Sequence, residues 1–151
     1  MQISARFAIA VHMLICMDLF KDEYKVTSEF LASSICVNPV VIRRIMQQLK
    51  SHGLIAVARG TGGAEVAKSP EEITLLDVYR AVEATKEEEL FRFHEHPNPE
   101  CFVGRNIHNI LEGELQAVQR AMEERMESVT LKSLFDEAAA LRRAEISCSR
   151  K

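Results

Sequence analysis

The chain has 151 residues, of which 47% are hydrophobic, and this content suits one globular unit with one ordinary core. Its longest apolar run, residues 7–17, is about half the roughly 20 residues that a membrane span needs, and no small-residue cleavage site follows it. We therefore expect a cytoplasmic protein that has no membrane partner and no signal peptide.

The net charge of −3 is unevenly distributed. Residues 1–68 carry 8 Lys and Arg against 5 Asp and Glu, a net +3, whereas residues 69–151 carry 11 against 17, a net −6. The interval 30–64 holds no acidic residue and four basic ones: Arg43, Arg44, Lys50 and Arg59. A locally basic surface is typical of a protein that binds a polyanion, although an ordinary solvated face is the alternative.

The pattern of apolar residues predicts a first helix over residues 3–20. Its predicted buried face consists of Phe7, Val11, Leu14, Ile15 and Leu19. A short second helix follows Thr27, which is a candidate N-cap. The residues of this helix that we expect to point inward are Phe30, Leu31 and Ile35, and Cys36-Val37 is expected to form a tight turn.

The pair Asn38-Pro39 predicts the start of a third helix, because Asn can cap a helix and Pro fits the first helical position. The predicted core stripe of this helix is Ile42, Ile45, Met46 and Leu49, which follow the helical period. The residues left facing outward are Val40, Arg43, Arg44, Gln47 and Lys50. Gly53 is expected to end the helix in the left-handed conformation.

Two short β-compatible segments, residues 54–57 and 64–67, flank the sequence Arg59-Gly60-Thr61-Gly62-Gly63. This arrangement predicts a hairpin with glycines at positive φ in its turn. A phosphate-binding loop would join a strand to a helix and would carry a Lys-Ser/Thr pair, which is missing here. The order of helices and hairpin is that of a winged helix-turn-helix, in which the third helix enters the major groove of DNA. Arg59 would then suit a narrow minor groove.

Five stretches carry a family resemblance: VTSEFLA (26–32), VNPVVIRRI (37–45), LKSHGLI (49–55), RGTGGA (59–64) and ITLLDVYRAVE (73–83). Together they resemble the Rrf-two family of bacterial transcriptional regulators, which includes IscR, NsrR and CymR. Any one stretch is a weak signal, but the ordered set is specific, and the resemblance covers nearly the whole chain. The resemblance implies a homodimeric repressor or activator in which a long C-terminal helix crosses to the partner.

The expected fold is therefore mainly α with a small β-hairpin wing, followed by a long C-terminal dimerisation helix. The expected regions are a winged-helix DNA-binding region (1–84), a connecting or sensor loop (85–104), dimerisation helices (105–145) and a disordered tail (146–151). The candidate DNA-contacting residues are Thr27, Ser28, Asn38, Val40, Val41, Arg43, Arg44, Gln47, Arg59, Gly60, Gly62 and Gly63. Arg43 and Arg44 suit phosphates or guanine edges, and their roles cannot be divided from the sequence.

The second half of the chain fits a dimer. Thr74-Leu75-Leu76-Asp77 resembles a capping box, and the helix after it should bury Leu75, Val78, Tyr79 and Val82. From about residue 104 to 126, apolar residues recur every three or four positions: Ile107, Ile110, Leu111, Leu115, Val118, Met122 and Met126. Such a long helix has more apolar surface than one small domain covers, so all but the last of these residues are expected in a dimer interface. Packing on its own chain is the alternative. A last helix is expected after Thr130.

Several Rrf-two regulators bind an iron-sulfur cluster through three closely spaced cysteines before the long helix, whereas this chain has only Cys101 there. We therefore predict no cluster, no other cofactor and no metal site. A mononuclear site formed by His94, His96, Cys101 and His108 is conceivable, but solvated loop histidines are commoner. Cys101 is instead a candidate redox sensor, because it precedes a helix and Arg105 follows; an inert cysteine is the alternative.

Two other classes of function are weaker. A cysteine hydrolase that uses Cys101 with His96 or His108 would need an orienting group and an oxyanion hole, which no spacing supplies, so we do not predict an enzyme. The second class is a protein-interaction module that keeps the same dimeric scaffold but has lost DNA binding. We predict a transcriptional regulator, with repression favoured, that binds an inverted-repeat operator in double-stranded DNA as a homodimer and responds to an unknown effector.

Overall fold

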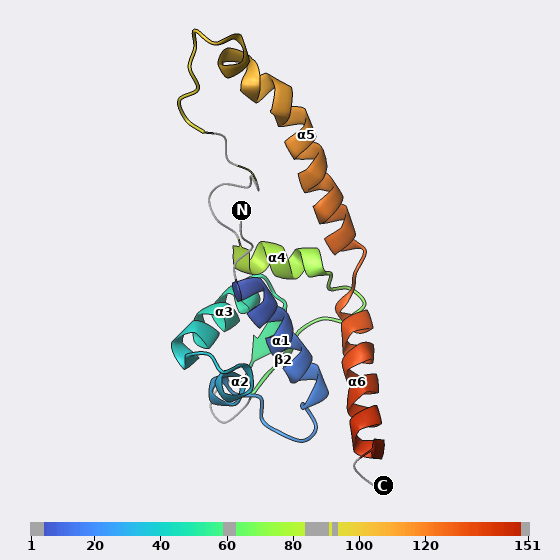
Figure 1. Ribbon diagram of the computed structural model, residues 1–151. Helices are drawn as coiled ribbons and strands as arrows, with labels where there is room; N and C mark the ends of the chain where they lie inside the picture. The colour runs from blue at the N-terminus through green and yellow to red at the C-terminus, as the bar shows by residue number, and fades with distance from the viewer. Residues whose placement is uncertain (1–4, 59–62, 84–90, 92–93, 149–151) are drawn as a thin grey trace.

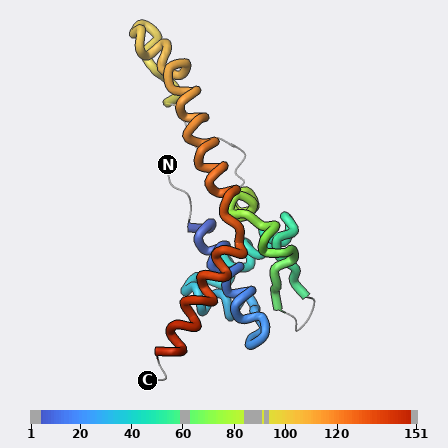
Figure 2. The backbone as a smooth tube through the Cα atoms, turned by 90° about the vertical axis from the view of Figure 1, so that its right-hand side faces the viewer, coloured from blue at the N-terminus to red at the C-terminus, as the bar shows by residue number. Residues whose placement is uncertain are grey.

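The computed structural model describes residues 5–58, 63–83, 91 and 94–148. The described elements are α1 (Ala5–Leu19), α2 (Ser28–Ile35), α3 (Pro39–Ser51), β1 (Ile55–Val57), β2 (Ala64–Val66), α4 (Leu75–Glu83), α5 (Phe102–Glu127) and α6 (Leu131–Cys148). The first four helices and the hairpin form a compact body, from which α5 projects, and α6 continues from the near end of α5 alongside α1 (Figures 1 and 2). The prediction of a mainly helical fold with one small hairpin is confirmed. We call the part from α1 to α4, with the hairpin, the winged-helix region.

The helix-turn-helix is set by local signals in the sequence. The hydroxyl of Thr27 accepts a hydrogen bond from the backbone N–H of Phe30 at 3.2 Å, which caps α2. Cys36 ends this helix in the left-handed conformation, with φ of 56°, and its N–H donates to the carbonyl of Ala32. Asn38 caps α3, and Pro39 is its first residue. The predicted caps, the position of Pro39 and the tight turn at Cys36 are confirmed, whereas the left-handed conformation of Cys36 was not predicted.

The link from α3 to the hairpin is a tight reversal at Gly53, which has φ of 68°. Its N–H donates to the carbonyl of Lys50 and the next N–H, that of Leu54, to the carbonyl of Leu49, both at 3.0 Å. These two bonds form a Schellman motif, which favours glycine at the left-handed position. The chain then enters β1, which pairs antiparallel with β2, with Ala56 opposite Glu65.

The core lies between α1 and the elements that surround it. The buried apolar residues are Ala10, Met13, Leu14, Cys16, Met17, Val26, Leu31, Ala32, Ile42, Ile45, Leu49, Leu54, Ile55, Ala64, Ile73, Leu76, Val78, Ala81, Val82, Leu131 and Phe135. Among the described residues no polar or charged side chain is fully buried. In that same part of the chain, no helix combines the length and the hydropathy that a membrane crossing requires.

The predicted inner faces of two helices need correction. On α1 the structure buries Leu14 as predicted, but Phe7, Val11, Ile15 and Leu19 are only half-buried. The fully buried residues of this helix are Ala10, Met13, Leu14, Cys16 and Met17. Neighbours α2, α3, α4, α6 and β2 surround α1, so its inner face is not a single stripe. On α4 the buried set is Leu76, Val78, Ala81 and Val82, and Leu75 and Tyr79 are half-buried.

The start of α4 also holds the junction between α5 and α6. Thr74 and Asp77 form the predicted capping box, because the N–H of Thr74 donates to Asp77 Oδ2 at 2.8 Å and the N–H of Asp77 to Thr74 Oγ1 at 3.2 Å. Thr74 also forms an isolated antiparallel bridge with Thr130. This bridge fixes the turn before α6 against the winged-helix region. The expectation of a disordered tail from residue 146 is wrong for residues 146–148, which continue α6.

Candidate nucleic-acid interface

Helix α3 has one buried face and one exposed face. Ile42, Ile45 and Leu49 are completely buried against the rest of the winged-helix region. The exposed residues of the helix include Val40, Arg43, Arg44, Gln47 and Lys50. The predicted division of this helix into two faces is therefore confirmed, and its outer face is basic, with no carboxylate from α3 itself. Val41 also lies at the surface, whereas Met46 is half-buried.

Arg43 is held by the first turn of α2. Its Nη2 donates to Glu29 Oε1 at 2.6 Å, and its Nε donates to Ser28 Oγ at 3.3 Å. The hydroxyl of Ser28 in turn donates to Glu29 Oε2 at 3.0 Å. The hydrogen bond from Arg43 is the main reason why the pKa of Glu29 lies below its ordinary value. The three side chains form a cluster on the surface, which we call the Arg43 cluster.

Arg44 differs from its neighbour. Its side chain is exposed, and the ion pairs found in the described residues do not include it. An unpaired guanidinium on a basic helix face can turn toward a phosphate without first leaving another partner. Arg43 and Arg44 are thus adjacent in sequence but stand in different environments.

Asn38 and Thr27 are both candidate DNA contacts, and the side-chain oxygen of each caps a helix. Asn38 Oδ1 accepts from the N–H of Val40 at 2.8 Å, so the amide nitrogen is the part of this side chain left for a base or a phosphate. Val40 has 67% of its surface exposed, which leaves a methyl-sized apolar contact on the outer face. An exposed valine at the start of a recognition helix suits the methyl group of thymine.

The base of the wing is packed against the turn before α2. The N–H of Ala64 donates to the carbonyl of Val26 at 2.9 Å. A Cβ at Gly63 would lie 2.8 Å from the backbone nitrogen of Val26, so this position requires glycine for close packing. Arg59, Gly60 and Gly62, the other wing candidates, lie outside the described residues. The sequence predicted positive φ in the turn or contact with DNA as the reason for the glycines. The first prediction is wrong for Gly63, whose φ is not positive, and its contact with Val26 was not foreseen.

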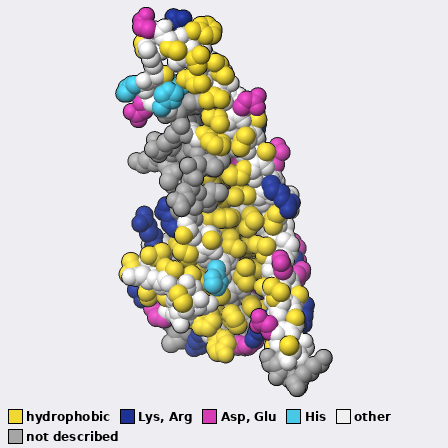
Figure 3. Space-filling model, in the orientation of Figure 1, with side chains coloured by type: hydrophobic (Ala, Val, Ile, Leu, Met, Phe, Trp, Pro, Cys, Tyr) yellow, Lys and Arg dark blue, Asp and Glu magenta, His cyan; other side chains and the backbone are white. Residues whose placement is uncertain are grey.

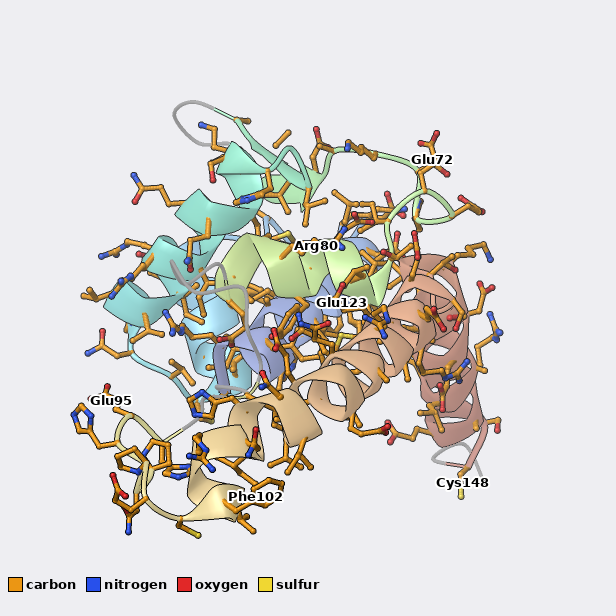
Figure 4. The ribbon with its side chains drawn as sticks, turned by 90° about the horizontal axis from the view of Figure 1, so that it is seen from above. Glu72, Arg80, Glu95, Phe102, Glu123 and Cys148 are labelled. Atoms are coloured by element: carbon orange, nitrogen blue, oxygen red, sulfur yellow. The ribbon has the colours of Figure 1, made fainter. Side chains whose placement is uncertain are left out.

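Helix α5 carries an apolar face that its own chain leaves largely open. Not one of its 26 residues is buried. The six predicted interface residues range from half-buried to exposed: Ile107, Ile110, Leu111, Leu115, Val118 and Met122. Figure 3 shows hydrophobic side chains in a continuous band that follows this helix. Toward its C-terminal end the helix is tied to α4 by an ion pair of 3.4 Å between Arg80 and Glu123, which Figure 4 shows facing each other.

The four cysteines lie on separate elements, and this bears on the iron-sulfur cluster that several regulators of the resembled family bind. Cys16 is buried in α1, Cys36 ends α2, Cys101 precedes α5 and Cys148 ends α6. Figure 4 labels Cys148 and Phe102, the neighbour of Cys101, well apart. No group of three or more His, Cys, Asp or Glu within the described ranges could hold a metal ion. Because a cluster needs several convergent thiolates, the residues present in one chain do not fit it.

The sensor candidate Cys101 is exposed at the position that precedes α5, and its carbonyl accepts the N–H of Arg105 at 2.9 Å. Of the histidines considered with it, His94 and His108 lie edge to face, with ring centroids 6.1 Å apart. Redox sensing by Cys101 stays a prediction. Mild peroxide treatment followed by mass spectrometry tests it, and a Cys101 thiol left unmodified would exclude it.

Sequence reasoning missed Glu29 as a member of the candidate interface. In the sequence, Glu29 is only the acidic residue that precedes the interval 30–64, which itself holds no acidic residue. Its partner Arg43 lies 14 positions later, and their pairing depends on the crossing of two helices, which spacing in the sequence does not encode. The available signal was weak: an acidic residue in the first turn of a capped helix that precedes a helix with a basic outer face.

A family model described as "iron-dependent transcriptional regulator", that of the Rrf2 family, matches residues 3–137. The chain is 43% identical over 134 residues to YwnA of Bacillus subtilis, which is named as an HTH-type transcriptional regulator; the match covers 89% of this chain and 97% of that one.

Two solved structures are also similar. One, of a protein described as DNA-binding, is 38% identical and has a TM-score of 0.67, with 85% of this chain and 97% of that one covered. The other, IscR from T. potens, is 19% identical and has a TM-score of 0.66, with coverage of 91% and 88%, so it supports the fold alone. With the family model matched over most of its length, the chain belongs to the Rrf2 (Rrf-two) family of transcriptional regulators.

Proposed function

We propose that this regulator is a bacterial, cytoplasmic repressor that binds an inverted-repeat operator in double-stranded DNA as a homodimer and holds no iron-sulfur cluster. The observation that carries the proposal is the exposed, basic outer face of α3 within a helix-turn-helix. A helix placed in this way enters the major groove, with residues of its N-terminal half nearest the base edges. Val40, Val41, Arg43, Arg44 and Gln47 would therefore form the surface that contacts DNA.

The proposed dimer rests on α5. Ile110 and Val118 have 55% and 52% of their surfaces exposed, although they lie on the apolar face of a helix of 26 residues. Large exposed apolar patches on soluble proteins usually mark interaction sites. A twofold interface between two such helices would cover the same residues on both copies. We therefore propose residues 105–145 as the dimerisation region, joined to the DNA-binding region 1–84 by residues 85–104.

A twofold dimer presents two copies of α3. Successive major grooves on one side of B-DNA are separated by one helical turn, roughly 34 Å, so the half-sites should repeat with that spacing. A dimer bound across a promoter would prevent polymerase from occupying it, which is why repression is the proposed outcome. The wing residues Arg59, Gly60, Gly62 and Gly63 are proposed to lie beside the minor groove or the phosphates.

A gel-shift experiment tests the proposal. The probe is a duplex that covers the promoter of the gene for this protein, with a scrambled duplex of equal length as competitor. We expect a sequence-dependent complex for the wild-type protein. Arg44→Ala should bind all sequences more weakly and lower the slope of log affinity against log salt by about 1, because it loses one phosphate contact.

The matched control is Arg143→Ala. Arg143 is exposed on α6, and its replacement removes the same positive charge far from α3 in the sequence. The control should leave the salt slope unchanged. If the wild-type protein forms no sequence-dependent complex with any duplex, the chain is better described as a protein-interaction module.

A further inference from the structure

The Arg43 cluster divides the roles of the two adjacent arginines. A guanidinium has five N–H donors in a rigid plane. In Arg43 the donors along one edge of that plane are engaged, because Nε donates to Ser28 and Nη2 donates to Glu29. The donors that remain are on Nη1 and on the second position of Nη2, at the end of the side chain. This end matches the two acceptors, O6 and N7, of a guanine in the major groove.

Glu29 and Ser28 therefore do not simply block Arg43. They hold its plane in one orientation while they leave its end available. Orientation matters for recognition of a base, since two parallel hydrogen bonds form only when the fork is aligned with the base edge. A phosphate, in contrast, accepts hydrogen bonds from many directions. Arg44, whose guanidinium is in none of the ion pairs of the described residues, has the freedom that suits a phosphate.

The negative charge of Glu29 has a second effect. It is exposed, with 64% of its side chain accessible, and it stands beside the basic face of α3. A carboxylate there repels the phosphates of every duplex to a similar degree, so it weakens binding to all sequences. Held orientation raises the ratio of specific to non-specific affinity. The repulsion, because it is similar for every duplex, lowers both affinities and leaves their ratio unchanged.

We propose that Glu29, supported by Ser28, is a positioning residue that determines specificity: it orients Arg43 for bidentate recognition of one guanine in each half-site, while Arg44 binds phosphate. This inference rests on the proposed DNA-binding function and assigns a role within it. Glu29 itself needs no contact with DNA.

The test selects bound duplexes from a library randomised over the operator length and compares the enriched sequences for the wild-type protein and Glu29→Ala. We expect the wild-type preference for guanine at one position of each half-site to be roughly 5- to 150-fold, the range for a bidentate contact. Glu29→Ala should lower this preference by about two- to fivefold, the size of effect that an exposed ion pair supports. Its affinity for unrelated duplexes should be unchanged or higher, because a repelling charge is gone.

The charge control is Glu65→Ala. Glu65 is exposed on β2, also in the winged-helix region, and its replacement removes the same negative charge. It should keep the guanine preference. Glu29→Gln retains an acceptor oxygen in the cluster and should keep more of the preference than Glu29→Ala does. Glu29→Gln also replaces Glu29→Ala in the comparison if the alanine variant folds poorly, which a thermal melt would show.

A double-mutant comparison makes the inference falsifiable. In an Arg43→Ala background the replacement Glu29→Ala should change no base preference, because the side chain that it orients is absent. If Glu29→Ala alters base preference equally in both backgrounds, or in neither, the inference is wrong. If the wild-type protein itself enriches no sequence, the proposed function fails instead, and the two failures are therefore distinguishable.

Discussion

Gly63 and Val26 lie so close that a Cβ on the glycine would be 2.8 Å from the backbone nitrogen and 3.1 Å from the carbonyl oxygen of the valine. The contact joins the second strand of the wing to the turn that precedes α2, and the hydrogen bond from the N–H of Ala64 to the same carbonyl accompanies it. The position of the wing relative to the helix-turn-helix thus depends on a residue without a side chain.

Gly63→Ala should therefore cost about 1–3 kcal/mol of folding stability, because backbone atoms rather than a flexible side chain would have to move. DNA affinity should fall as well, since the wing is displaced. Chemical denaturation measures the first effect and fluorescence anisotropy with a labelled duplex the second. Gly113→Ala is the control, because open space surrounds a Cβ at that position of α5. A Gly63→Ala protein with wild-type stability would show that the contact is not close in solution.

Asn38 has two proposed roles that one variant pair can separate. Asn38→Ala should lose the cap of α3 and about 0.5–2 kcal/mol of stability. Asn38→Ser keeps an oxygen that can cap, so it should retain most of the stability. If Asn38 also bonds to DNA through its amide nitrogen, the serine variant should still bind the operator more weakly than the wild-type protein does. Equal affinity of the serine variant and the wild-type protein would leave Asn38 with capping alone.

Ile110→Glu should break the proposed dimer. Each copy would lose the burial of an isoleucine, about 1.5–3 kcal/mol, and would place a charge in an apolar interface. Analytical ultracentrifugation should show a shift from dimer to monomer. Asn109→Glu adds the same charge at the next residue, which lies on the opposite side of the helix from the apolar face, and should leave the dimer intact. A monomeric wild-type protein, or a dimeric Ile110→Glu variant, would contradict the interface.

Arg142 of α6 links that helix to the end of α1. Its Nη2 donates to Glu23 Oε2 at 2.7 Å, and its guanidinium lies over the ring of Phe20, 5.1 Å from the centroid. The hydrogen bond, assisted by the positive charge, lowers the pKa of Glu23 below its ordinary value of 4.5.

A carboxyl group whose pKa is lower in the folded state adds stability above its unfolded pKa and loses it as the pH falls through the folded one. The wild-type protein should therefore have a higher Tm than Glu23→Gln at pH 7, and the difference should shrink toward zero below pH 4.5. Asp22→Asn, which removes a neighbouring carboxylate of the same loop, is the control for charge. A difference in Tm that stays constant with pH would show that the ion pair does not form in solution.

The sequence was sufficient where a structure is decided within a few residues. Thr27, Asn38 and Thr74 each cap a helix as predicted, and Gly53 adopts the left-handed conformation as predicted. These features depend on short-range hydrogen bonds and on backbone sterics, which residue types report directly. The two faces of α3 were predictable for the same reason, since its core residues follow one helical period.

The sequence was insufficient where several elements meet. The predicted inner face of α1 was wrong because five other elements pack around that helix. Met13 and Met17 are therefore buried, as Leu14 is. The pairing of Glu29 with Arg43 and the packing of Gly63 on Val26 join residues far apart in the chain. Their positions depend on how elements cross, which no local pattern encodes. The proposed partner of the α5 face is a second copy of the chain, which no pattern within one chain describes.

The most direct test of the central claim is selection of bound fragments from genomic DNA by the purified wild-type protein, followed by sequencing. If α3 is presented twice to a duplex, the enriched fragments should share an inverted repeat whose half-site centres are about one helical turn, or a whole multiple of it, apart. Enrichment of no common sequence, or of a single unrepeated site, would contradict the account of a dimer that places two recognition helices in successive major grooves.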